Sequence, residues 1–435
     1  MSAFTTSMRV ARRGAWLSAA LVLAAPSVCA AQRGEARDEE PKEHKPAIIW
    51  ADHVFTGVGD ESAGGMVTIE NGKIRLVTRG RGGDDLGQEP LRCFAVTAGL
   101  VDASVRITGG AASVEQSREI APDVRVAPSL DPFDPAWDRQ VRSGVTTVLV
   151  NPPDQNVIGG LGVVLKTAGP ESIAERTLLA DAVLRGSMGS QPSRGNHPAR
   201  RSPDDFYSRR PTTRMGVEWE WRKAFYDAAA AAGDEERAFP GSDRLVAALK
   251  GDLTVSIQAW GTQDIRTAVF LKEEILREEE FKTGLNEPRF FLDATAEAWK
   301  EPQLLVRARI PVVLPPFPPS GRTGENAFMA WDTAEELRKH GVPFALSSHG
   351  RPDIEDRLPM QAGYAMMGGL PFADALAAVT SVPARLLGVA DRVGTIEAGK
   401  DADLVLWSGM PFEPTSRILA VIVDGVVRYD ALDAR

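Results

Sequence analysis

Val96-Thr97-Ala98-Gly99-Leu100-Val101-Asp102-Ala103-Ser104-Val105-Arg106 is the most informative stretch of the chain. An apolar strand enters a Gly-Leu-Val-Asp-Ala turn, and two polar side chains, Ser104 and Arg106, follow it. Arginine stays positively charged at any accessible pH and offers only hydrogen-bond donors, so it repels a divalent cation. A serine hydroxyl is a poor metal ligand unless it is deprotonated. The end of this strand is therefore polar and ill suited to a metal ion.

Short strands with hairpin turns occur at both ends of the chain. Asn71-Gly72 and Asp424-Gly425 are typical of two-residue turns between antiparallel strands. An isolated three-stranded sheet buries too little surface to be stable, so the two halves predict one composite β domain over residues 46–95 and 391–435. The predicted strands are residues 47–50, 66–70 and 73–77 in the first half and residues 402–407, 418–423 and 426–429 in the second.

Residues 96–390 alternate between short β-branched runs and helical stretches, which is typical of a parallel α/β architecture. A β/α barrel of eight units fits the roughly 300 residues available, although a doubly wound sheet would give the same local pattern. Residues 185–214 are rich in Gly, Ser, Pro and Arg and are predicted to form a long loop. The clearest strands and helices are residues 145–150, 253–257, 289–292 and 311–314, and residues 264–280 (with Asp264 as cap), 333–339 and 371–379.

The chain has 435 residues and a net charge of -9, which disfavours a nucleic-acid or anionic-membrane partner. Arginines followed by an apolar run and small residues predict a cleaved signal peptide over residues 1–31, then a charged leader over residues 32–45. We therefore expect an exported protein, periplasmic or secreted, with no stable membrane span after cleavage. An uncleaved anchor, twin-arginine export through Arg12-Arg13 and lipid attachment at Cys29 are the alternatives. Cys93 then remains as the single cysteine, interpreted as a small core residue rather than a nucleophile.

Several blocks together resemble amidohydrolases of the imidazolonepropionase-like group. The most specific block is Gly399-Lys400-Asp401-Ala402-Asp403-Leu404, preceded by Thr380 and Pro383-Ala384. The resemblance implies a TIM-like β/α barrel with a composite β-sandwich domain. It also implies a metal-dependent hydrolase of non-peptide C–N bonds in amides or cyclic amides. The other blocks are residues 98–103, 144–152 and 158–166.

Within the resemblance, most metal-ligand positions are substituted. The His-x-His pair that follows the first barrel strand in the family is replaced by Ser104 and Arg106. Later ligand positions hold Gln258, Asp293 and, in place of an aspartate, His349. Catalytic zinc normally takes three protein ligands, and only Asp293 and His349 are good candidates.

The substituted positions leave several functions open. The leading hypothesis is a protein whose metal chemistry is lost or altered and which acts by binding a small amide-type ligand or an unknown partner protein. The alternative is an active hydrolase with a reduced metal site, or with His349, Asp293 and Ser104 as a metal-free catalytic set and Arg106 and Gln258 contacting substrate. A third class is a structural subunit. Arg106 paired with Asp293 could also fill the vacated pocket.

No cofactor is predicted, unless the site retains zinc or another divalent metal. Lys166 could be carbamylated as in some relatives, although an ordinary strand-end lysine is the simpler interpretation. If Ser104, Arg106, Gln258, Asp293 and His349 converge, these positions have been matched correctly.

Overall fold

The computed structural model describes residues 47–58, 62–80, 90–107, 115, 117–194, 211–281, 286–318, 325, 327–350 and 357–432. The predicted signal peptide, the charged leader and Cys29 lie outside the described residues. None of the helices in the described part of the chain is both long and apolar enough to cross a bilayer.

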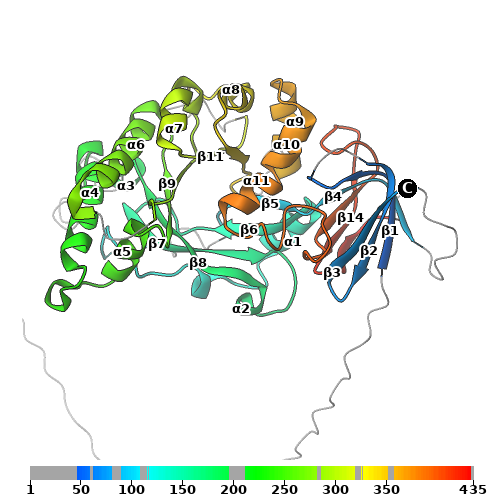
Figure 1. The fold of residues 1–435 in the computed structure, drawn as a ribbon, viewed down its shortest axis with the longest axis horizontal. Coiled ribbons are helices and arrows are strands. Elements are labelled where there is room, and N and C mark those ends of the chain that lie inside the picture. Colours follow the sequence, from blue (N-terminus) through cyan, green and yellow to red (C-terminus); the bar gives the residue numbers. More distant parts are fainter. Residues whose placement is uncertain are drawn as a thin grey trace, which may run out of the picture. The chain divides into compact units, whose positions relative to one another are not determined.

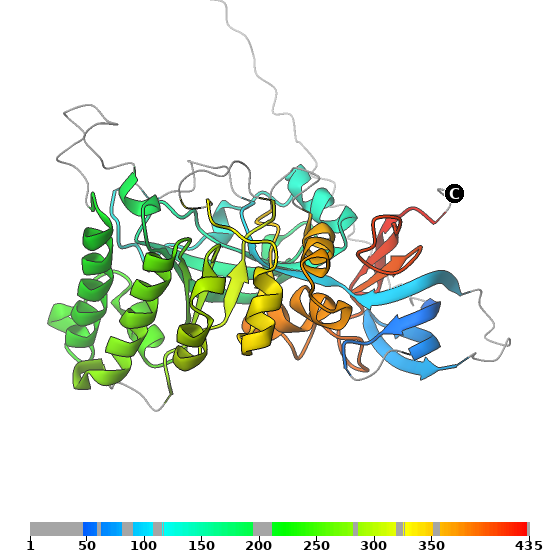
Figure 2. The same ribbon diagram turned by 90° about the horizontal axis from the view of Figure 1, so that it is seen from above.

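The two ends of the chain form one seven-stranded sheet, which confirms the composite β domain (Figure 1). The N-terminal and C-terminal halves join where β4 pairs antiparallel with β13, with Thr97 opposite Val405. Figure 2 shows the blue N-terminal strands beside the red C-terminal strands. In sheet order the strands are β15 (Val426–Asp430), β14 (Ile418–Val423), β13 (Leu404–Trp407), β4 (Leu91–Ala98), β1 (Ala47–Phe55), β2 (Ser62–Glu70) and β3 (Lys73–Arg79).

The two hairpin turns of this sheet have the backbone that their sequences predict. Asn71 and Gly72 have φ values of 51° and 75°, and Asp424 and Gly425 have φ values of 49° and 76°. Asn, Asp and Gly adopt this left-handed backbone most readily. A Cβ atom on Gly425 would lie 2.9 Å from Cα of Gly72, so the two turns are in close contact.

Cys93 lies in the core of this sheet, where burial raises the pKa of its thiol to about 12. A buried, protonated thiol is a poor nucleophile, which agrees with the interpretation of Cys93 as a core residue.

A second sheet of eight strands forms the barrel and confirms this architecture over the doubly wound alternative. Its strands pair in chain order, and a bridge between Val105 and His349 brings the last strand back to the first. The strands are β5 (Leu100–Val105), β6 (Val145–Val150), β7 (Ile158–Lys166), β8 (Thr177–Ser187), β9 (Thr254–Gln258), β10 (Phe290–Asp293), β11 (Val312–Leu314) and β12 (Phe344–Leu346).

Strand β7 runs antiparallel to both β6 and β8, so the barrel departs here from eight regular β/α units. Residues 151–157 join β6 to β7 without a helix. A parallel neighbour needs a crossover of a dozen or more residues, whereas a short connection returns the chain in the opposite direction.

The prediction of a loop over residues 185–214 was wrong at both ends of this segment, and residues 195–210 lie outside the described residues. Residues 185–187 end strand β8, and Arg214 begins helix α4 (Arg214–Ala231). Gly186 is a glycine because a Cβ there would lie 2.2 Å from the Val157 carbonyl oxygen and 2.3 Å from the Trp221 ring. Its presence therefore reflects close packing within a strand and does not mark a loop.

The helices follow the barrel strands, and the predicted helices at residues 333–339 and 371–379 are present. Asp264 does not cap its helix, because Gly261 occupies the cap position and Asp264 lies buried inside the first turn, 2.9 Å from Nε of Arg214. The remaining helices are α1 (Pro135–Arg142), α2 (Ile173–Arg176), α3 (Gln191–Arg194), α5 (Ser242–Leu249), α6 (Thr262–Arg277), α7 (Pro302–Ala308), α8 (Thr333–His340), α9 (Leu358–Met367), α10 (Phe372–Ala378) and α11 (Ser381–Leu386).

Lys166, at the end of β7, links the barrel to the C-terminal part of the β domain through ion pairs. Its Nζ lies 2.6 Å from Asp403, 3.0 Å from Asp401 and 3.1 Å from Asp424. Burial alone would lower the pKa of Lys166, but the three carboxylates outweigh it and raise the pKa. The lysine therefore stays charged within this cluster.

Removing this buried charge should weaken the whole fold. We expect Lys166→Met to lower the free energy of unfolding by about 3–5 kcal/mol, because it removes the cation that the buried Asp403 carboxylate contacts. Lys73→Met is the matched control, since Lys73 pairs with Asp401 but is 49% exposed, and it should lose less than about 1 kcal/mol. Urea unfolding of the three proteins measures both values, and equal losses would contradict a stabilising role specific to Lys166.

Candidate functional site

The candidate site lies at the C-terminal ends of the barrel strands and contains Asp293, the last residue of β10. Its carboxylate is fully buried and accepts hydrogen bonds from Oγ of Ser104 at 2.7 Å and Nη2 of Arg185 at 2.6 Å. Nε2 of His349 lies 3.3 Å from its other oxygen. Three of the predicted residues, Ser104, Asp293 and His349, therefore meet at one carboxylate.

A second carboxylate, that of Asp154, contacts the other two predicted residues. Nε2 of Gln258 donates to it at 2.7 Å, and Arg106 forms a salt bridge with the same oxygen. Arg185 donates to the other oxygen through Nη2 at 2.7 Å and Nε at 3.0 Å. The Arg106 side chain is 39% exposed, so one cation of this group faces solvent.

Arg185 joins the two carboxylates. Its side chain is 1% exposed and donates to Asp154, to Asp293 and, through Nη1, to Oγ of Ser256 at 2.8 Å. Burial alone would lower the pKa of Arg185, but the two aspartates raise it. Burial alone would likewise raise the pKa of Asp293, whereas Arg185, His349 and Ser104 together hold it well below its usual range. Both partners are therefore charged.

Asp102 joins the first barrel strand to the segment that follows the last one, beside this site. Its buried carboxylate accepts hydrogen bonds from Oγ of Ser347 at 2.6 Å and from the Ser348 backbone N–H at 2.9 Å. These bonds fix the end of β12 against β5 and so position His349. His349 and Ala294 have φ values of 51° and 59°, a left-handed backbone that non-glycine residues seldom adopt and that is found preferentially at functional sites.

The five predicted site residues converge, but the predicted Arg106–Asp293 pair was wrong. Arg106 pairs with Asp154, and Asp293 pairs with Arg185. Neither Arg185 nor Asp154 is among the site residues predicted from the sequence. Arg185 had been assigned to a loop, although it directly follows the apolar strand residues Val183 and Leu184. Asp154 follows a predicted strand by four residues, which is a usable signal for a barrel-mouth position.

The residues present do not fit the metal ion that the fold family implies. Two guanidinium groups take part in the network, and both oxygens of Asp293 are engaged. Across the described part of the chain, no three His, Cys, Asp or Glu side chains are grouped so that they could hold a metal ion. Lys166 does not fit a carbamate either, because an anionic carbamate would face three aspartates.

The arrangement also differs from a serine–histidine–carboxylate triad. In such a triad the histidine lies between the serine and the carboxylate and takes the hydroxyl proton. Here the Ser104 hydroxyl donates directly to Asp293, and His349 contacts the same carboxylate from another side. Because the pKa of Asp293 is depressed, this carboxylate is also a weak general base.

Two buried polar atoms beside the network have no hydrogen-bond partner among the described residues: Oε1 of Gln258 and Nε1 of Trp260. The Trp260 ring packs edge-on against His349, with ring centroids 6.2 Å apart. One atom accepts and the other donates a hydrogen bond. An acceptor and a donor are the two kinds of group that the N–H and C=O of an amide need as partners.

Comparisons with known proteins agree with the fold. A model of the amidohydrolase family matches residues 324–428. Amidohydrolase tasK of Hapsidospora irregularis is 26% identical over 436 residues, covering 88% of this chain and 43% of that protein. Imidazolonepropionase of Erwinia tasmaniensis is 43% identical over 77 residues, covering 17% of this chain and 19% of that enzyme. The matches thus cover less than half the length of either curated relative.

The structural likeness extends over most of the chain. The crystal structure of an amidohydrolase from Thermotoga maritima MSB8 matches with a TM-score of 0.76 and 28% identity, covering 88% of this chain and all of that one. A Xaa-Pro dipeptidase with bound methionine, at 16% identity and a TM-score of 0.55, shares the fold. In its barrel, its composite β domain and these likenesses, the chain is similar to proteins of the amidohydrolase superfamily.

Proposed function

We propose that this protein binds a small amide-type molecule at the barrel mouth and does not carry out metal-dependent hydrolysis. The observation that carries the proposal is the buried Arg185, ion-paired with Asp154 and Asp293. A metal ion bound by Asp293 would displace the guanidinium and leave it buried without one of its two counter-charges. Such an unpaired buried charge costs several kcal/mol, which opposes metal binding.

The chemistry of the ligand follows from the groups around the network. Gln258 and Trp260 offer one free acceptor and one free donor, which match an amide. Arg106 adds a partly exposed cation at the same mouth, which favours a ligand that also carries a carboxylate. An N-acylamino acid or a cyclic amide with a carboxylate side chain combines these features.

A metal-free hydrolase is the second candidate, because Ser104, Asp293 and His349 are in contact. The position of Asp293 between the other two residues argues against it, since His349 does not then take the serine proton. An active hydrolase with a reduced metal site, held by Asp293 and His349, is a separate alternative, and the ion pair of Arg185 with Asp293 argues against it.

Metal analysis separates these functions. We expect the purified full chain, after dialysis against zinc or manganese, to hold well below one ion per chain by mass spectrometry, because Arg185 neutralises the carboxylates. Hydrolysis of hydantoins and N-acylamino acids should stay at the background rate with and without a chelator. One tightly held ion, whose removal abolishes hydrolysis, would contradict the proposal, and so would metal-free hydrolysis that Ser104→Ala abolishes.

Calorimetry tests ligand binding on the same purified protein. It should detect binding of an amide that also carries a carboxylate. Arg106→Gln should weaken this binding roughly tenfold, the order expected for one charge-assisted hydrogen bond. Arg222→Gln is the control, because Arg222 pairs with Glu274 away from the mouth. Equal effects of the two substitutions would argue against binding at the mouth.

Arg185→Met tests the network directly. We expect a loss of about 3–5 kcal/mol in the free energy of unfolding at neutral pH, because two buried carboxylates lose their counter-ion. The depressed pKa of Asp293 means that its stabilising charge is present above the unfolded pKa of about 3.9 and is lost as the pH falls. The difference from the unsubstituted protein should therefore narrow below about pH 4. Urea titrations at several pH values measure this difference, and a pH-independent or negligible difference would contradict the account.

Export is part of the proposal and is supported by the sequence of residues 1–31. When the full chain is expressed in a bacterium, the mature protein should be recovered from the periplasmic fraction, with an N-terminus at about residue 31 or 32. Recovery of uncleaved chain from the cytosol would contradict this part of the proposal.

A further inference from the structure

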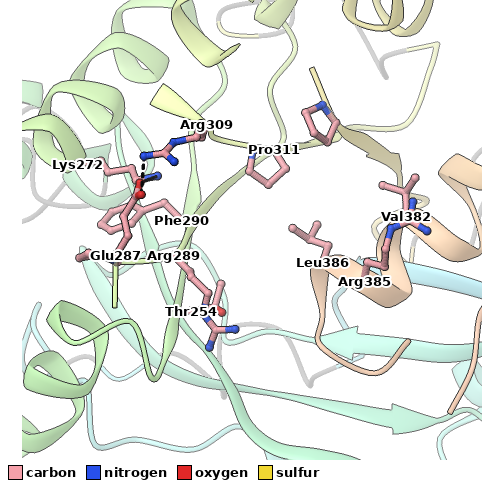
Figure 3. Close-up of a pocket in the computed structure, with 12 residues that line it drawn as sticks. Thr254, Lys272, Glu287, Arg289, Phe290, Arg309, Pro311, Val382, Arg385 and Leu386 are labelled. Carbon is pink, nitrogen blue, oxygen red and sulfur yellow. Dashed lines mark hydrogen bonds and ion pairs between the residues drawn. The ribbon is translucent and has the colours of Figure 1, made fainter. Parts of the chain in front are cut away.

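A cavity of about 590 Å³ lies at the opposite ends of the same barrel strands (Figure 3). Thr254 and Phe290, the first residues of β9 and β10, line it. Pro311 and Pro343, which directly precede β11 and β12, line it as well. The candidate site uses the other ends of these strands, through Gln258, Asp293 and His349, so the two sites are separate. The cavity has the size of a small-molecule pocket, about 300–1,000 Å³.

The charge of the cavity is opposite to that of the chain. Four basic side chains and one acidic side chain line it, whereas the whole chain has a net charge of -9. A concave surface lined by one sign of charge attracts ligands of the other sign. The charged residues are Lys272, Arg289, Arg309, Arg385 and Glu287.

The single acidic group is already engaged with two of the basic groups. Glu287 lies 3.2 Å from Nζ of Lys272 and 2.6 Å from Nη2 of Arg309. Nζ of Lys272 is buried and also donates to the Ala308 carbonyl at 2.9 Å. These three side chains form one wall of the cavity and leave no acidic group to neutralise the others.

Arg289 and Arg385 have no carboxylate partner in the described part of the chain. Arg289 donates to the backbone carbonyls of Gly251 and Asp252 at 3.0 and 3.1 Å. Arg385, on helix α11, is exposed, and its side chain forms no hydrogen bond or ion pair with any described residue. Figure 3 shows the two arginines on different sides of the opening, with Pro311 and Leu386 also facing it. Charged donors therefore lie beside an apolar surface.

We propose that this cavity binds a small organic anion, with a carboxylate or phosphate group held by Arg289 and Arg385 and an apolar body against Phe290, Pro311 and Leu386. Guanidinium groups bind both oxyanions through paired N–H donors. The apolar wall selects against small inorganic anions, because its burial contributes to binding only when the ligand has an apolar part. This inference does not depend on the chemistry of the barrel mouth.

Calorimetry with phenyl phosphate and benzoate tests the proposal on the full chain. At least one of the two should bind at least tenfold more tightly than both inorganic phosphate and the neutral benzyl alcohol, and added salt should weaken its binding. The comparison of the two ligands identifies which oxyanion is preferred. Failure of both to bind, or equal binding of inorganic phosphate or benzyl alcohol, would overturn the proposal.

Substitutions locate the binding. Arg385→Gln should weaken anion binding roughly tenfold, and the fold should persist because the Arg385 side chain has no partner among the described residues. Arg289→Gln should act in the same direction. Arg307→Gln is the matched control, since Arg307 is exposed, pairs with Glu273 and does not line the cavity. Unchanged binding in Arg385→Gln, with loss in Arg106→Gln, would place the anion at the barrel mouth and overturn the inference.

Discussion

The buried ion pairs of Arg185 with Asp154 and Asp293 determine what the barrel mouth can do. Desolvation makes each of these charges unfavourable alone, and their mutual contact makes them stable together. Ser104, Gln258, Arg106 and His349 are hydrogen-bonded or ion-paired to the same two carboxylates, so their orientation depends on this pairing. The pairing also lowers the pKa of Asp293, which makes this carboxylate a weak general base.

On the proposed function, the fold is kept while the chemistry of its site changes. Hydrogen bonds from Ser347 and Ser348 to the Asp102 carboxylate close the barrel next to the mouth. Lys166 and its three aspartates still join the barrel to the β domain. These interactions maintain the amidohydrolase fold, whereas the activity depends on a few side chains at the strand ends, where this chain has arginines.

Much of the fold could be predicted from the sequence because its signals are local. Asn71-Gly72 and Asp424-Gly425 specify turns through their own backbone preferences, and β-branched runs indicate strands. The direction of β7 could not be predicted with the same ease, because it depends on how a short connection pairs two strands. Gly186 was misleading, since a glycine required by close packing has the same appearance in a sequence as a loop glycine. Because of that error Arg185 was assigned to a loop. The five site residues were therefore predicted from the sequence, whereas Arg185, their central partner, was not.

The position of the Arg185 guanidinium is the most direct test of this account. Crystals grown with millimolar zinc, with diffraction data collected at the zinc absorption edge, would reveal both the side chain and any bound ion. The account predicts guanidinium density between Asp154 and Asp293 and no anomalous peak within bonding distance of Asp293 or His349. A zinc peak ligated by these two residues, with Arg185 turned away from Asp293, would contradict it.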